Sequence, residues 1–434
     1  MQKNKFIICT LIIMLLNIFF IPIYAISTSK EISAISEDCV RPAFTIVDNV
    51  GVNSENKEVK QKVDSKPVAT NVEFSFKSKS QILMEASTGK IIYENNAYEK
   101  CLPASVTKVM TLLLIMEAID SGKISYEDKV TCSANASSMG GSQIWFKEGE
   151  EITVDEALKC ICIVSANDVC IAMAEMIGGS ETNFVKMMND KAAILGMTGT
   201  NFVNSHGIDD ENHYTTARDI AVMSRELILN HPDIIKYTTI WMDSIRGGTF
   251  GLSNTNKLIR YYEGATGLKT GYTSKALYNL SATATKNNMS LIAVITGAPT
   301  SDIRNEETKQ LLNFGFTNFD VEGLLEKGIV VDELMINKYL GGKVKIVTES
   351  DISLLKEKGK KVEAQKEVDI NKNITAPIKA GSKVGEIKYK DQEGNLIGKT
   401  NLVIKDKINK SGVLDYIKHS FKIYGLSVDV FNKN

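Results

Sequence analysis

The stretch that decides the fold reads Pro103-Ala-Ser-Val-Thr-Lys-Val-Met-Thr-Leu-Leu-Leu-Ile-Met-Glu-Ala-Ile119. A proline is tolerated in the first turn of a helix, and the run that follows it is apolar on nearly every side. A helix of this composition is buried inside a protein. It nevertheless carries Lys108 near its start, and a lysine in such a helix requires a specific reason.

The sequence on both sides of this helix predicts one sheet with strands from the two ends of a domain. Short strand-like runs, bounded by turn residues, are expected at 81–85, 90–94, 267–273, 279–285 and 289–296. Helical runs are expected at 105–119, 154–164, 168–177 and 301–314. Because the strands lie outside and the helices lie between them, this order indicates an α+β domain.

The composition divides the chain into five parts. They are a signal peptide (1–25), a flexible segment (26–75), the α+β domain (76–318), a small all-β domain (319–407) and an amphipathic C-terminal tail (408–434). The flexible segment is polar and has no helical period. The all-β domain is predicted from short alternating runs that Gly, Lys and Asp separate.

The N-terminus has the pattern of a secretory signal. Lys3 and Lys5 precede an apolar run that ends at Tyr24, and Ala25 is a small residue suited to cleavage. The alternative is an uncleaved membrane anchor, since the run is nearly long enough to span a bilayer. In either case we expect the protein to be exported and to work outside the cytoplasm.

The C-terminal tail is predicted to be an amphipathic helix. Its apolar face consists of Val413, Leu414, Ile417, Phe421 and Tyr424. Such a helix could rest in a membrane interface, or it could dock on the protein itself. The sequence does not favour one of these alternatives over the other.

The composition also argues against several classes of partner. The formal net charge is −1, so no overall field draws the chain to nucleic acid. No C-x-x-C pair and no His/Cys cluster with zinc spacing occurs, so we expect neither a metal nor a cofactor. Of the seven cysteines, Cys9 leaves with the signal, and the others permit disulfides in an exported chain. Cys160, Cys162 and Cys170 lie in apolar helical sequence, where we expect small buried side chains.

Three short motifs occur in order along the α+β domain. They are Ser105-Val-Thr-Lys108, Ser165-Ala-Asn167 and Lys269-Thr-Gly271. Taken singly, each has an ordinary explanation, because such residues also begin helices, cap them or form turns. Their conjunction, with each motif in a fitting structural context, favours a single nucleophilic site.

The first motif has the residue types that nucleophilic catalysis requires. A serine hydroxyl is a weak nucleophile and needs a base nearby. Residues three apart share one face of a helix, so Lys108 can reach the Ser105 hydroxyl. The pKa of a free lysine is about 10.4, but burial and a nearby cation lower it. Lys269 is the candidate for that cation.

The other two motifs supply the remaining functions. Ser165 can pass a proton between the base and the leaving amine, and Asn167 offers a donor and an acceptor to a substrate amide. Lys269 and Thr270 can bind the terminal carboxylate of a peptide. Gly271 lets another backbone approach the strand closely. The N–H groups of Ser105 and Tyr272 are candidates for an oxyanion hole.

With these motifs, the sequence resembles the serine-type D-alanyl-D-alanine carboxypeptidases, which are the low-molecular-mass penicillin-binding proteins of peptidase family S11. The likeness includes Ala136-Ser-Ser-Met-Gly-Gly-Ser-Gln143, Asn204-Ser-His-Gly207 and His213-Tyr-Thr-Thr-Ala-Arg-Asp219. It runs from about Gln81 to Phe319, and more loosely through the all-β domain to about residue 407.

This resemblance implies a β-lactamase/transpeptidase-like domain, an antiparallel sheet with a helical cluster, followed by the small all-β domain. It implies removal of the terminal D-alanine from peptidoglycan pentapeptides at the cell wall or the outer face of the membrane, with β-lactams as covalent inhibitors. The residues that carry over are Ser105 as the acylated nucleophile, Lys108 as proton acceptor, Ser165 and Asn167 in the second motif, and Lys269 as a substrate-binding residue. Members often have an amphipathic tail at the membrane.

Two other functions remain alternatives. A serine β-lactamase uses the same three motifs, but class A enzymes deacylate through a glutamate in an E-x-x-L-N run. No such run follows Ser165, and Glu211 is the only acid of that type in 204–219, so we expect slow deacylation of penicillin. A non-catalytic β-lactam sensor or wall-binding protein has no need of both Ser105 and Lys108.

The histidines do not indicate a Ser-His-Asp triad. His206, His213, His231 and His419 are the four in the chain, and none lies in a G-x-S-x-G context or in metal spacing. We therefore expect His206 and His213 to be structural.

Overall fold

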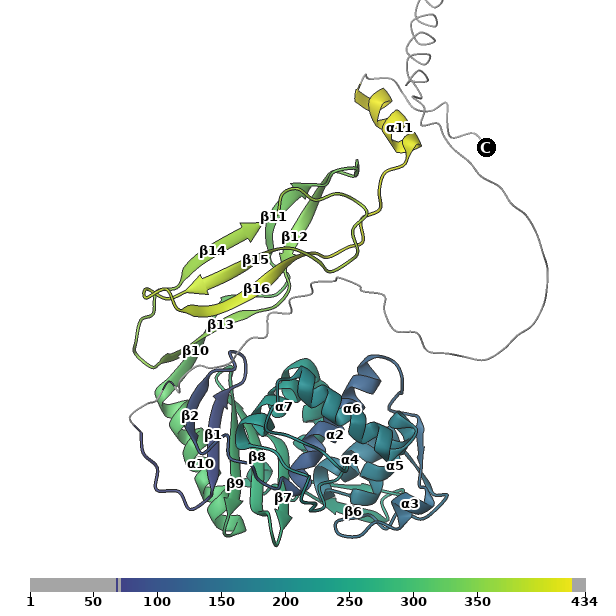
Figure 1. Cartoon of the computed structure of the whole chain (residues 1–434), viewed down its shortest axis with the longest axis vertical. Coiled ribbons are helices and arrows are strands. Elements are labelled where there is room, and N and C mark those ends of the chain that lie inside the picture. Colours follow the sequence, from purple (N-terminus) through teal and green to yellow (C-terminus); the bar gives the residue numbers. More distant parts are fainter. Residues whose placement is uncertain (1–67, 69–71, 424–434) are drawn as a thin grey trace, which may run out of the picture. The chain divides into compact units, whose positions relative to one another are not determined.

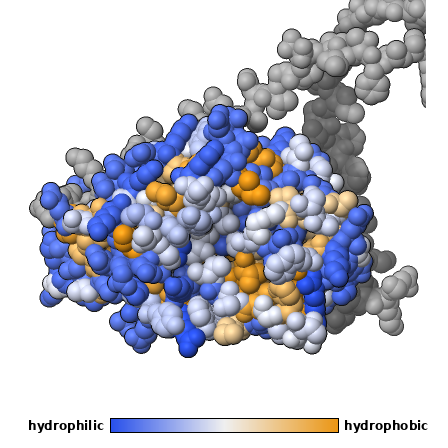
Figure 2. All heavy atoms as spheres, turned by 90° about the horizontal axis from the view of Figure 1, so that it is seen from below, coloured by the Kyte–Doolittle hydropathy of each residue, from blue (hydrophilic) through white to orange (hydrophobic). Residues whose placement is uncertain are grey.

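The computed structural model describes Val68 and residues 72–423. The predicted signal peptide, most of the predicted flexible segment and the end of the tail lie outside the described residues. Among those described, no helix is both long enough and apolar enough to span a bilayer. On the face drawn in Figure 2, apolar side chains lie in small separate groups among hydrophilic ones, as is usual for a surface in water.

A five-stranded sheet organises the first domain, and every strand pair in it is antiparallel. Its order is β2-β1-β9-β8-β7, so strands from both ends of the domain sequence meet in the sheet and β7 lies at an edge. The strands are β1 (Ser80–Glu85), β2 (Ile91–Asn95), β7 (Ala265–Thr273), β8 (Leu277–Lys286) and β9 (Met289–Ala298). This arrangement confirms the predicted α+β class.

Helices cover the two faces of this sheet (Figure 1). One face packs on α10 (Ser301–Asn318), and the other packs on a helical cluster. The cluster contains α2 (Lys108–Asp120), α5 (Asn167–Gly178), α6 (Glu181–Ile194) and α7 (Ala217–Asn230). The residues of α2 from Lys108 to Met116 are all buried, as the all-round apolar sequence predicted.

Shorter elements complete the domain. They are η1 (Ala104–Thr107), β3 (Lys129–Thr131), α3 (Ala134–Ser137), β4 (Glu151–Thr153), α4 (Val154–Lys159), η2 (Cys160–Val164), η3 (Pro232–Ile234), α8 (Ile235–Thr238), β5 (Met242–Ile245), β6 (Phe250–Ser253) and α9 (Leu258–Tyr261). Two of them correct predicted helices. The run expected from residue 105 begins with the 3₁₀ helix η1, and the run expected at 154–164 ends as the π-helix η2.

The C-terminal domain is all-β, as predicted, and has its own apolar core. The strands β10 (Phe319–Leu325) and β13 (Ile352–Glu357) form one pair. A separate sheet has the order β11-β12-β16-β15-β14. Its strands are β11 (Val330–Met335), β12 (Lys343–Thr348), β14 (Gln365–Ile370), β15 (Ser382–Lys390) and β16 (Leu396–Ile404). The helix α11 (Val413–Ile423) follows, and none of its residues is buried.

Candidate active site

Lys108 is the point at which the first two motifs meet. Its side chain has no exposed surface, and its amine Nζ lies 3.0 Å from Ser105 Oγ. The same Nζ donates to Asn167 Oδ1 at 2.7 Å and to the backbone carbonyl of His206 at 2.6 Å. Three segments that are far apart in the sequence therefore converge on one amine.

Ser105 lies in a strained turn that precedes the α-helix. Ala104 has a φ of +48°, in the left-handed region, which costs about 1–3 kcal/mol for a residue other than glycine. Thr107 Oγ1 donates to the Ala104 carbonyl at 2.9 Å. Gly207 packs so closely that a Cβ there would lie 1.9 Å from the same oxygen. These contacts hold a turn that leaves Ser105 half-buried while Lys108 is fully buried.

The second motif lies where η2 ends and α5 begins. Ser165 has a φ of +66°, and its hydroxyl is buried without a hydrogen-bond partner among the described residues. An unpaired buried polar group costs about 1–3 kcal/mol, and a catalytic role is one of the reasons for which native structures retain such a group. The loop before this motif holds Asn167 in place. Asn167 Nδ2 donates to the Gly140 carbonyl, and the Asn167 backbone N–H donates to the Ser142 carbonyl, both at 2.7 Å.

Asp168, which the sequence analysis did not single out, ties this motif to the loop before it. Its Oδ2 accepts from the N–H groups of Ile144 and Phe146, both at 3.0 Å. Arg246 Nη1 donates to the Ile144 carbonyl at 2.9 Å. Trp145 between them is held with a φ of +52° and remains 65% exposed. Burial raises the pKa of Asp168. An acid in the first turn of a helix was the available sequence signal.

The third motif lies on the edge strand β7. Lys269 is 1% exposed, and its Nζ donates to the Thr270 carbonyl at 3.1 Å. Thr270 Oγ1 lies 2.8 Å from Thr255 Oγ1, so Thr255 joins the site from the segment after β6. Tyr272 is 54% exposed. Because β7 pairs with β8 on one side only, its other edge can receive an extended peptide.

Gly271 explains how this strand approaches the nucleophile. A Cβ on Gly271 would lie 2.7 Å from the Pro103 carbonyl oxygen and 3.1 Å from the Ser105 nitrogen. Any larger residue would therefore push the turn away from β7. The absence of a side chain brings the N–H of Ser105 next to the strand that carries the N–H of Tyr272.

The two buried lysines have lowered pKa values. Burial is the largest cause for both: it lowers the pKa of Lys108 to about 8, while the pKa of Lys269 is lowered to about 7 by burial and by the charge of Lys108. Two ammonium groups in one buried site destabilise each other. The pair therefore loses one of its two protons near neutral pH, which leaves one of the two amines neutral.

Two histidines border the site, and both are held neutral. Burial is the largest cause that lowers the pKa of His206 to about 3 and that of His213 to about 4. The His213 ring lies 2.8 Å from Thr107 Oγ1 and accepts from the Val203 N–H. The backbone carbonyl of His206 accepts a hydrogen bond from Lys108. The spacing of the motifs could not predict this contact, because every residue has a carbonyl.

The cysteines near the second motif are buried, as predicted. All five within the described part of the chain are free thiols: Cys101, Cys132, Cys160, Cys162 and Cys170. Burial raises the pKa of Cys170 to about 11 and that of Cys162 to about 12. Thiols with such values are protonated and unreactive at neutral pH.

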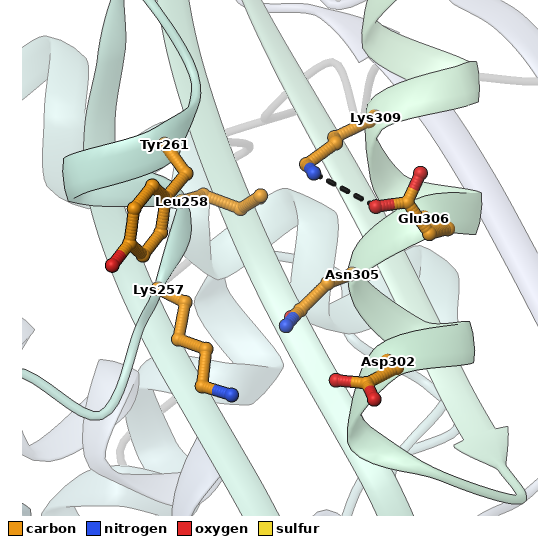
Figure 3. Close-up of a pocket in the computed structure, with 7 residues that line it drawn as sticks. All are labelled: Lys257, Leu258, Tyr261, Asp302, Asn305, Glu306 and Lys309. Atoms are coloured by element: carbon orange, nitrogen blue, oxygen red, sulfur yellow. Dashed lines mark hydrogen bonds and ion pairs between the residues drawn. The ribbon is translucent and has the colours of Figure 1, made fainter.

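A pocket of about 180 Å³ lies apart from the three motifs. Figure 3 shows it between α9 and α10, lined by Lys257, Leu258, Tyr261, Asp302, Asn305, Glu306 and Lys309. On the α10 side of it, Lys309 and Glu306 form an ion pair at 2.8 Å. No motif residue lines this pocket, so it does not belong to the candidate active site.

One group of side chains has the donor types of a cation site. Glu117, Glu226 and His231 bring one ligand atom each within 4.8 Å of one another. The Lys191 ammonium already contacts both carboxylates, at 2.5 Å and 3.1 Å. The lysine thus supplies the positive charge that these carboxylates require.

Comparison with protein families shows matches to both domains. The model of the D-alanyl-D-alanine carboxypeptidases, peptidase S11, matches residues 64–300. The model of the penicillin-binding protein 5 C-terminal domain matches residues 319–410.

Individual proteins agree with these matches. D-alanyl-D-alanine carboxypeptidase DacF of Bacillus subtilis is 42% identical over 352 residues, which cover 80% of this chain and 90% of the relative. The crystal structures of penicillin binding protein 5 from Haemophilus influenzae include a chain with 31% identity and a TM-score of 0.64, covering 78% of this chain and 99% of that one. Penicillin-Binding Protein D2 from Listeria monocytogenes, in its ampicillin-bound form, has 27% identity and a TM-score of 0.52, covering 56% of this chain and 100% of that one.

Proposed function

This chain belongs to the D-alanyl-D-alanine carboxypeptidases of peptidase family S11, and we propose that it releases the terminal D-alanine of peptidoglycan pentapeptides through an acyl-enzyme on Ser105. The observation that carries this assignment is the buried Lys108 amine, 3.0 Å from the Ser105 hydroxyl. Asn167 lies on the same amine, and Gly271 brings β7 against the nucleophile's turn.

In the acylation step, neutral Lys108 accepts the hydroxyl proton as Ser105 Oγ attacks the carbonyl carbon of the penultimate D-alanine. The N–H groups of Ser105 and Tyr272 receive the developing oxyanion. As the C–N bond breaks, the proton passes through the Ser165 hydroxyl to the leaving amine, and D-alanine departs. This hydroxyl is free for that role, since it has no hydrogen-bond partner in residues 72–423. Water then attacks the ester, which releases the shortened stem and restores the Ser105 hydroxyl.

Substrate binding and base formation are coupled through the two lysines. The terminal carboxylate of the peptide binds at Lys269 and Thr270, and an anion there favours the charged form of Lys269. A charged Lys269 in turn disfavours a proton on Lys108, because the two buried amines repel. The bound substrate therefore promotes the neutral Lys108 that the reaction needs.

β-Lactams acylate the same hydroxyl in this proposal. Deacylation of the penicilloyl-enzyme is slow, because the segment 204–219 has only Glu211 as an acid of the β-lactamase type, and Glu211 is exposed. Rapid, repeated hydrolysis of nitrocefin would show that the protein is a β-lactamase instead.

The chain is also proposed to be exported and to work at the outer face of the cytoplasmic membrane. The N-terminal sequence pattern supports export. In α11, the side chains of Val413, Leu414, Ile417 and Ile423 are all exposed, which supports adsorption of this helix to a membrane surface. Cosedimentation of the full chain with anionic vesicles tests this. Binding that survives Leu414→Glu with Ile417→Glu would exclude α11 as the anchor.

Labelled penicillin followed by peptide mapping tests the nucleophile. We expect the label on the peptide that contains Ser105, and we expect it to persist for many minutes. The variant Ser105→Ala should show neither the label nor D-alanine release from a pentapeptide. D-alanine release that survives in Ser105→Ala would overturn the assignment.

A further inference from the structure

A buried amide on β8 holds the segment that precedes the nucleophile. Asn279 has no exposed surface and lies directly opposite Gly271 in the ladder between β7 and β8. Paired residues of an antiparallel ladder point to the same face of a sheet. Asn279 therefore faces the turn at Pro103 to Ser105, which can approach β7 because Gly271 has no side chain.

The amide group of Asn279 is fully used. Its Nδ2 donates to the carbonyl of Leu102 at 2.9 Å and to that of Pro103 at 3.2 Å. Its Oδ1 accepts from the N–H of Gly297 on β9 at 2.8 Å. The side chain is thus anchored on the sheet by its oxygen and holds the turn by its nitrogen.

The Pro103 carbonyl needs such an external anchor. It accepts from the Val106 N–H at 3.2 Å, which closes the 3₁₀ turn, and it lies against Gly271. Between Pro103 and Ser105, Ala104 has a positive φ, which an alanine does not adopt by local preference. Without the Asn279 donors, this turn would lose its direct side-chain link to β8.

We propose that Asn279 is a positioning residue, which fixes the N–H of Ser105 relative to the N–H of Tyr272 and so sets the oxyanion hole of the acylation step. This rests on the proposed function, in which those two groups receive the oxyanion. Oxyanion donors act because they are held in place before charge develops. Asn279 supplies that restraint from the strand beside β7.

The test uses the full chain with Asn279→Ala and with the milder Asn279→Ser. We expect kcat for D-alanine release to fall about 10- to 100-fold, since loss of a whole oxyanion donor costs about 100- to 1000-fold, while KM stays within about twofold. A peptide boronic acid, which forms a tetrahedral adduct on Ser105, is expected to bind more weakly by a factor similar to the loss in kcat.

Asn189→Ala is the matched control. Asn189 makes the same pattern elsewhere, with Nδ2 donating to two carbonyls and Oδ1 accepting from the Phe202 N–H. This variant is expected to lower Tm and to leave kcat and boronate affinity within about twofold. A lower Tm for both Asn279 variants with unchanged kcat and boronate affinity would reduce Asn279 to a structural residue. Penicillin labelling of Ser105 in the wild type is the separate check on the proposed function.

Discussion

The active-site region and the C-terminal β domain bury polar groups in opposite ways. Around Ser105, two lysines are fully buried and the Ser165 hydroxyl has no partner among the described residues. In the β domain the buried hydroxyls are satisfied: Thr348 Oγ1 donates to the Glu326 carbonyl, and Thr400 Oγ1 accepts from a backbone N–H. Its core is otherwise built from apolar side chains such as those of Ile346, Ile387 and Leu402.

This difference separates two uses of burial. In the β domain, burial removes apolar surface from water and stabilises the fold. In the active site, burial destabilises charge, and that cost is what brings the lysine pKa values toward neutrality. Substitutions in the two regions should therefore affect different quantities.

The sharpest test of the contrast is Lys108→Met. We expect it to slow acylation by penicillin about 10³-fold or more, because no neutral amine remains beside Ser105. The protein should still fold, since the substitution removes a buried cation and keeps most of the side-chain volume. Stopped-flow acylation and thermal unfolding measure the two effects.

Lys123→Met provides the control for Lys108→Met. Lys123 also donates to a backbone carbonyl, that of Ile177 at 2.6 Å, but it belongs to none of the motifs. The Lys123→Met variant should be acylated by penicillin at the wild-type rate. Acylation by Lys108→Met within tenfold of the wild type would contradict the assigned base.

Lys269→Met is expected to have the next largest effect. It should lower kcat/KM about 100-fold for a peptide with a free terminal carboxylate, because a charge-assisted hydrogen bond is lost. With a C-terminally amidated peptide, the wild type and the variant should be equally slow. Equal losses for both substrates would show that Lys269 acts through the Lys108 pKa or the fold and does not bind the carboxylate.

The pH dependence of kcat/KM should be bell-shaped. Below about pH 7 both amines are protonated and no base is present, whereas above about pH 8 both are neutral and the cation for the carboxylate is lost. Each limb should change about tenfold per pH unit. Initial rates between pH 5.5 and 9.5 test this, and a flat profile across that range would contradict it.

The smallest catalytic effect is expected in the β domain. Ile346→Ala should lower the free energy of unfolding by about 2–5 kcal/mol, because a fully buried side chain leaves a cavity. Penicillin acylation of the folded protein should remain within about twofold. Denaturant unfolding and the acylation rate are the measurements, and a large loss of acylation would show that the β domain acts on the site.

Much of the site was readable from the sequence. The three-residue spacing of Ser105 and Lys108 and the apolar run after them predicted a buried lysine near a hydroxyl. The alternation of apolar residues predicted the β domain, where β12, β15 and β16 contain the expected runs. The signals were strong because each depends on a local period.

The unpredicted parts depend on contacts between distant segments. A 3₁₀ turn stands at Ser105 in place of the expected α-helical start, and Gly207, far along the chain, packs against the Ala104 carbonyl of this turn. Asn279 was placed within a predicted strand, but its partners at Leu102 and Pro103 could not be inferred. No sequence pattern around an asparagine predicts which distant backbone groups its amide will bind.

By itself, the sequence determined the residue types of the site, their order and the secondary structure that carries most of them, since these follow from local spacing and periodicity. Only the tertiary structure decided that Lys108 touches Asn167 and the His206 carbonyl, that the Ser165 hydroxyl has no partner within the described part of the chain, and that two lysines share one buried site. The physical reason is that a pKa and an unpaired donor depend on the surrounding atoms, and packing brings those atoms from distant parts of the chain.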